Sequence, residues 1–159
     1  MTRIKIALVA VVAGIFALTG SSASAEAPGV EAHIRHLMHG MFDRPDARLT
    51  VDPIVASGDY ALAGWTQAET GGRALLRRKN EAWVIILCAG DAIRTADALV
   101  KVGMPARVAD DLAKALAQAE SKISPERLAM FSRFDGIMMI DEGNSHPPHP
   151  QSHGRTHGH

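Results

Sequence analysis

LTVDPIVASGDYALAGWTQAETGGRALLRRKNEAWVIILC, residues 49–88, divides into four short segments that have the character of β-strands. The segments LTVDPIVAS, YALAGWTQAE, RALLRRK and WVIILC are separated by glycine, asparagine, aspartate and other residues that favour tight turns. Four consecutive strands joined in this way predict an antiparallel meander. The expected turns are at Gly58-Asp59, Thr70-Gly71-Gly72 and Asn80-Glu81.

The outer and inner strands of this sheet can be told apart. Pro53 cannot donate a hydrogen bond to a neighbouring strand, so the first strand is expected at an edge of the sheet, or else it starts after Pro53. The segment WVIILC is apolar on both alternating sets of residues, which predicts a central strand covered on both faces. These two sets are Trp83, Ile85 and Leu87 on one face and Val84, Ile86 and Cys88 on the other.

Helices are expected on both sides of the meander in the chain. The segment from Val30 to Phe42 has helical periodicity, and its large apolar residues fall within an arc of about 100°. The turn-forming run Asp43-Arg44-Pro45-Asp46 ends this helix. The predicted buried face consists of Val30, Ile34, Leu37, Met38 and Met41.

Three further helices are expected after Gly90. Their predicted limits are Asp91 to Val102, Pro105 to Lys122, and Ser124-Pro125 to Gly136, and Val108, Leu112 and Leu116 form a core-facing stripe in the second. The predicted fold class is α+β: an N-terminal helix, a four-stranded antiparallel meander sheet, and C-terminal helices packed on the sheet. A cystatin-like or nuclear-transport-factor-like arrangement is the expected topology.

The two ends of the chain differ from this domain. Arg3 and Lys5 precede an apolar run, and Ala23-Ser24-Ala25 has the small residues that signal peptidase requires, so residues 1–25 are predicted to be a cleaved signal peptide. Residues 26–142 then form a single domain, expected in the periplasm without a membrane anchor. Residues 143–159 are rich in histidine and proline, with nothing large and apolar to bury, and are expected to be disordered.

Composition excludes several function classes. The chain has 17 basic and 17 acidic residues, and loss of Arg3 and Lys5 leaves 15 against 17, which argues against binding to nucleic acid. The single cysteine, Cys88, cannot form an internal disulfide and is expected either to be buried or to be used chemically. The sequence carries no recognised catalytic motif, and Asp141 and Glu142 are expected to be solvated acids. The protein is therefore not expected to be an enzyme.

The first helix carries candidate metal ligands. His33, His36 and His39 lie within an arc of about 120° opposite Met38 and Met41, which are expected to fill the core. Histidines spaced i,i+3 bring their Cβ atoms to about 5–6 Å, close enough for two imidazoles to reach one ion. His33 and His39 are separated by about 9 Å of helical rise, so one ion takes two of the three and needs further ligands from elsewhere. The alternative is a solvated polar face.

The tail adds histidines that a flexible chain can bring together around one ion. Imidazole binds copper(II), nickel and zinc, with copper favoured by intrinsic affinity. Histidines alone do not select one metal, so zinc and nickel stay open as alternatives to a copper ion, whose oxidation state is unspecified. The tail ligands are His146, His149, His153, His157 and His159.

Residues 30–142 resemble a group of small exported bacterial proteins called copper uptake system-associated proteins. The resemblance rests on TVDPIVASGDYALAGW, GGRALLRRK, WVIILCAGDA and the later MFSRFDGIMMIDEG, together with the histidine-rich end. It implies a periplasmic accessory to copper acquisition, working beside a copper chaperone or membrane copper transport components. It carries no set of ligand residues that can be transferred to this chain.

Two other functions stay open at this point. The domain can be a protein-interaction module of a transport system, with only incidental metal binding by the tail. It can also be a small-ligand-binding domain, because a cupped sheet covered by a helix often holds an apolar ligand. An apolar cavity without convergent metal ligands would favour the second of these.

Overall fold

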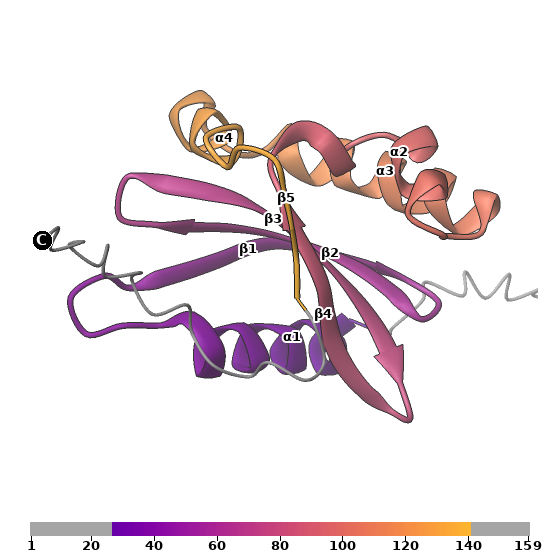
Figure 1. Cartoon of the computed structure of the whole chain (residues 1–159), viewed down its shortest axis with the longest axis horizontal. Helices are drawn as coiled ribbons and strands as arrows, with labels where there is room; N and C mark the ends of the chain where they lie inside the picture. The colour runs from indigo at the N-terminus through magenta and orange to yellow at the C-terminus, as the bar shows by residue number, and fades with distance from the viewer. Residues whose placement is uncertain (1–26, 141–159) are drawn as a thin grey trace, which may run out of the picture.

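The computed structural model describes residues 27–140, which form three layers (Figure 1). Helix α1 (Ala27–Phe42) covers one face of an antiparallel sheet, and the later helices cover the other face. The predicted signal peptide and histidine-rich tail, with Asp141 and Glu142, lie outside the described residues. No helix within residues 27–140 is both long enough and apolar enough to cross a membrane.

The sheet confirms the predicted meander and extends it by one strand. Its order is β1-β2-β3-β4-β5, with every neighbouring pair antiparallel. The strand β5, which follows the helices, was not predicted: it pairs with only three residues of β4, too short a segment to give a periodic signal. The strands are β1 (Leu49–Ser57), β2 (Tyr60–Gln67), β3 (Thr70–Lys79), β4 (Ala82–Ala89) and β5 (Ile137–Met139).

The turns at Gly58-Asp59 and Asn80-Glu81 are confirmed, and Pro53 lies on the edge strand β1 as expected. The middle turn was misplaced. It falls at Ala68 and Glu69, whereas Gly71 and Gly72 lie in β3.

Glycine in the sheet serves close packing against the C-terminal helices. A Cβ atom on Gly64 would lie 2.8 Å from the ring of Phe131 and 2.9 Å from Pro53 Cδ. Gly71 is similarly crowded, because its Cβ atom would lie 3.1 Å from the carbonyl oxygen of Met130. These glycines let the helix α4 (Pro125–Phe131) approach the backbone of β2 and β3.

We expect Gly64→Ala to lower the free energy of unfolding by about 1–3 kcal/mol, because the new methyl group must displace the fully buried ring of Phe131. Gly40→Ala is the matched control, since a Cβ atom on Gly40 would meet nothing within 4 Å in α1. The control should be neutral or slightly stabilising. Urea denaturation of both variants measures the difference, and equal stabilities would contradict this packing role.

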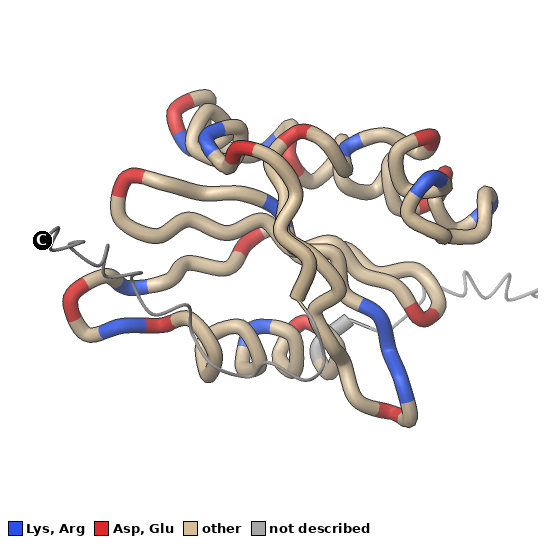
Figure 2. Tube along the Cα trace, viewed as in Figure 1, with Lys and Arg blue, Asp and Glu red and all other residues tan. Residues whose placement is uncertain are grey.

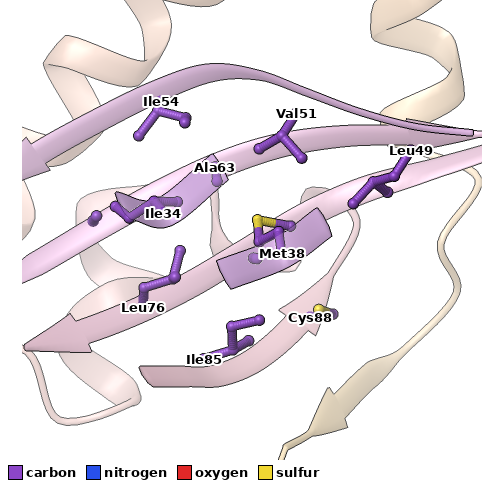
Figure 3. Packing of buried hydrophobic residues seen from close by; sticks show 11 residues of the cluster. Ile34, Met38, Leu49, Val51, Ile54, Ala63, Leu76, Ile85 and Cys88 are labelled. Atoms are coloured by element: carbon purple, nitrogen blue, oxygen red, sulfur yellow. The ribbon is translucent and has the colours of Figure 1, made fainter. Parts of the chain in front are cut away.

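The sheet separates two hydrophobic clusters, as predicted for a central strand covered on both faces. The cluster beneath α1 includes Ile34 and Met38 together with Ile85 and Cys88 of β4 (Figure 3). The cluster on the opposite face includes Leu87 and Ala89 of the same strand, packed with side chains of the C-terminal helices.

A β-bulge changes which residues of β4 share a face. Leu75 pairs with Leu87 and Leu76 with Ile85, which leaves Ile86 without a partner on β3. An extra residue reverses the in-and-out alternation of a strand. Cys88 therefore lies with Ile85 on the α1 face, and the predicted grouping of Cys88 with Ile86 was wrong.

Helix α1 is rotated relative to the predicted buried face. Ile34 and Met38 are buried at its centre, and Phe42 packs partly against the same cluster. On this side of α1, Arg35 Nε also donates a hydrogen bond of 3.2 Å to the carbonyl oxygen of Val51. Val30 and Leu37 pack partly against the cluster as predicted, whereas Met41 is 37% exposed, so its predicted role in the core was wrong.

The helices after the sheet are shorter than predicted. The first is interrupted: a 3-10 turn, η1 (Asp91–Ile93), precedes α2 (Ala96–Lys101), because Thr95 caps α2 by accepting a hydrogen bond from the backbone N–H of Ala98. The second, α3 (Ala106–Glu120), buries Leu112 and Leu116 as predicted, and Val108 is partly buried. The third, α4, ends at Phe131 well before Gly136.

Candidate functional site

The α1 histidines lie on the side of the helix away from the sheet core. His33 and His36 are exposed, whereas His39 is half-buried. Ile34 and Met38 occupy the buried side of α1. The helical spacing therefore places the histidines on the other side. The structure therefore keeps His33 and His36 accessible as an i,i+3 pair.

His39 has a different environment from the other two. Its Nδ1 lies 3.7 Å from Oδ2 of Asp43, one helical turn later. The same carboxylate accepts hydrogen bonds of 2.7 Å from Arg48 and 2.8 Å from the backbone N–H of Leu49. The bond from Leu49, followed by that from Arg48, lowers the pKa of Asp43 below its usual value. Asp43 is thus held by Leu49 and Arg48, and its distance from His39 is too long for a hydrogen bond.

The described residues do not complete a histidine site. Between residues 27 and 140, no three side chains of the histidine, cysteine, aspartate or glutamate types are arranged to hold a metal ion. The five predicted tail ligands lie outside this range: His146, His149, His153, His157 and His159. His33 and His36 of α1 supply two accessible imidazoles.

A second candidate site is an apolar cavity of about 160 Å³ between α1, the sheet and the segment around β5, the kind of cavity that the small-ligand-binding alternative requires. Aromatic side chains form much of its wall, including Phe42, Trp65 and Phe134. Three sulfur-containing side chains also line it: Met38, Cys88 and Met138.

Cys88 is buried, which is one of the two alternatives predicted for it. It is 6% exposed, and burial raises the pKa of its thiol to about 12. Raising a thiol pKa in apolar surroundings keeps the sulfur protonated and unreactive at neutral pH. Cys88 therefore behaves as an apolar group unless a ligand in the cavity displaces its proton.

Charged side chains of both signs are spread over the layers, with one basic run on the β3–β4 hairpin (Figure 2). Two charged side chains are buried among the described residues: Glu120 of α3 is 4% exposed, and Arg73, in the middle of the sheet, is 1% exposed. Its Nε donates to Glu120 at 2.6 Å, and its Nη1 donates to the carbonyl oxygen of Gly90 at 3.1 Å and to Asp91 at 3.0 Å. These bonds join β3 to η1 and to the end of α3, so the network has a structural role.

No protein-family model, no curated protein and no solved structure matches this chain.

Proposed function

We propose that this protein is a periplasmic accessory of copper uptake, similar to the copper uptake system-associated proteins. In this proposal it binds or buffers copper through histidines and passes the ion to a periplasmic copper chaperone or to membrane copper transport components. The observation that carries the proposal is the exposed i,i+3 pair His33 and His36 on α1. Zinc and nickel are the alternative metals.

In the proposed mechanism, histidines of the tail capture copper first. The folded domain then receives the ion at His33 and His36, with a tail histidine completing the coordination. The protein is a carrier in this account and catalyses no reaction.

The topology that we propose for α1 and the meander is cystatin-like, with a nuclear-transport-factor-like arrangement as the alternative. A single helix laid across four consecutive antiparallel strands supports it. Helices α2, α3 and α4 on the far face are an addition to that arrangement.

The cavity favours a second candidate function, the binding of a small apolar ligand. Its volume is close to the roughly 150 Å³ of an engineered apolar cavity that binds benzene, and far below the roughly 300–1,000 Å³ of typical ligand pockets. A ligand enclosed entirely within it would be about the size of a single ring. The remaining rival, a protein-interaction module with incidental metal binding by the tail, is distinguished by the following experiment.

The test is copper(II) binding by competition with a chelator, using residues 26–159, residues 26–142, and residues 26–159 with His33→Ala and His36→Ala together. We expect both the truncation and the double substitution to weaken binding, because each removes part of one shared site. The matched control replaces exposed Lys114 and Gln118 of α3 with alanine and should leave the affinity unchanged. Affinity that falls only with the tail would remove the folded domain from metal binding and favour the interaction module.

A further inference from the structure

The sulfur atoms lining the apolar cavity come from three separate elements of the fold. Met38 belongs to α1, Cys88 to the end of β4, and Met138 to β5. Cys88 and Met138 are directly paired across the β4–β5 ladder. Paired residues in antiparallel strands point to the same face of the sheet, with Cβ atoms about 4.5–5.5 Å apart. Both side chains therefore face the layer that contains α1.

Met38 lines the cavity from the side of α1. It is 1% exposed and belongs to the same buried cluster as Cys88, and Figure 3 shows the two residues within that cluster. Met138, by contrast, is 48% exposed on the short edge strand. The group thus has two buried sulfur atoms and a third at the margin of the cavity, where an ion can enter.

The polar groups around the cavity do not suit a hard cation. Gln67 lines the wall, but its amide nitrogen donates to the carbonyl oxygens of Phe42 and Ala47, at 2.7 and 2.8 Å. Magnesium and calcium prefer several oxygen ligands, whereas thiolate and thioether sulfur select copper(I). The donor set of the cavity is therefore specific for a soft ion.

We propose that Met38, Cys88 and Met138 form a binding site for copper(I), with the Cys88 thiolate and two thioether sulfur atoms as its ligands. The thiol loses its proton to solvent as the copper–sulfur bond forms, and copper enters and remains as copper(I). A thiolate, a copper(I) ion and two thioethers together carry no net charge. An apolar cavity accepts this neutral group at far lower cost than an isolated ion.

This inference rests on the proposed function for the identity of the metal, and it adds the oxidation state and a second site. Ile140, which lines the cavity, lies six positions before His146 in the chain. An extended chain spans at most about 3.3–3.6 Å per residue, so His146 is tethered within about 20 Å of Ile140. Copper captured at His146 is therefore held within reach of the cavity.

The test is anaerobic copper(I) binding to residues 26–159, by competition with a chromogenic copper(I) chelator, for the parent, Cys88→Ala and Met138→Leu. We expect each substitution to lower copper(I) affinity by more than about 10-fold. Loss of a residue that only supports a metal ligand already costs roughly 10-fold or more, and these substitutions remove a ligand itself. Met41→Leu and Met139→Leu are matched controls and should bind as the parent does. Met41 lies on the exposed margin of α1, and Met139 pairs with Leu87, whose side chain belongs to the opposite cluster.

Two further readouts separate loss of a ligand from loss of the fold. Silver(I), a probe without redox chemistry, should quench tryptophan fluorescence in the parent because Trp65 lines the cavity, and Met138→Leu should weaken this response. Release of one proton per ion makes copper(I) affinity rise about tenfold per pH unit between pH 6 and 8. This slope should disappear in Cys88→Ala.

The result that would overturn the inference is copper(I) affinity in Cys88→Ala and Met138→Leu equal to that of the parent. A different result would contradict the proposed function. That result is a copper(II) affinity that does not change when His33 and His36 are both replaced by alanine. Copper(II) binding should be the same in the parent and in both sulfur variants. The two outcomes are therefore independent.

Discussion

Arg73→Met is expected to lower the free energy of unfolding by about 3–5 kcal/mol, because it leaves the buried carboxylate of Glu120 without its closest partner. The Arg73 side chain is 1% exposed and that of Glu120 is 5% exposed, so water cannot replace the lost bond. The substitution also removes the hydrogen bond to Gly90 and the cation–π contact with Phe131, whose ring centre lies 5.3 Å from Arg73 Cζ. Urea denaturation followed by circular dichroism measures the loss.

The matched control is Arg78→Met, which makes the same substitution on the same strand. Arg78 pairs with Asp59 at 2.9 Å, but the two side chains are 39% and 60% exposed. Exposed ion pairs contribute about 0–1 kcal/mol, so this variant should lose far less stability than Arg73→Met. Equal losses in the two variants would contradict the structural role of the buried network.

A double substitution shows how the network acts. Replacing Arg73 and Glu120 together by apolar residues, as in Arg73→Met with Glu120→Leu, removes both buried charges at once. Buried ion pairs replaced in this way are often close to neutral in stability. We therefore expect the double variant to be more stable than Arg73→Met alone, and a double-mutant cycle to give a coupling within the range of about 0.5–3 kcal/mol.

The second large effect is the pH dependence of copper(II) binding. A histidine ligand must be neutral, and histidine changes charge between about pH 5 and 8. Below about pH 6 protons compete with the metal at every ligating imidazole, so a site with two histidines loses affinity steeply. We expect copper(II) affinity to fall by at least about 100-fold from pH 7.5 to pH 5.

The measurement is a chelator competition at several pH values, with the affinity of the chelator corrected at each. Residues 26–142 should show a shallower dependence than residues 26–159, because fewer histidines take part. An affinity that stays flat from pH 7.5 to 5 would exclude histidine as the ligand.

The meander and both layers of helices could be predicted from the sequence because each rests on local patterns. The turns at Gly58-Asp59 and Asn80-Glu81 and the apolar faces of β4 are read from neighbouring residues. The turn before β3 was misplaced because Gly71 and Gly72 have the composition of a turn. Gly71 lies instead close to α4, and Gly72 close to Ala89 and Phe134, which are contacts between distant parts of the chain.

The residues that line the apolar cavity could not be predicted, for related reasons. The bulge at Ile86, which moves Cys88 to the α1 face, depends on pairing between β3 and β4. The short strand that brings Met138 beside Cys88 has only three residues. Arg73 in the segment RALLRRK resembles its exposed neighbours Arg77 and Arg78, and only the tertiary fold distinguishes it. His33 and His36, whose positions depend on spacing alone, lie on the accessible side of α1 as expected, whereas His39 is half-buried.

The central claim is that this protein handles copper. Its most direct test is competitive binding of copper(I), copper(II) and zinc to residues 26–159, with the isolated peptide of residues 143–159 as the reference. We predict that residues 26–159 bind copper more tightly than zinc, and more tightly than the tail peptide does. Copper affinity no greater than that of the peptide, in both oxidation states, would contradict it.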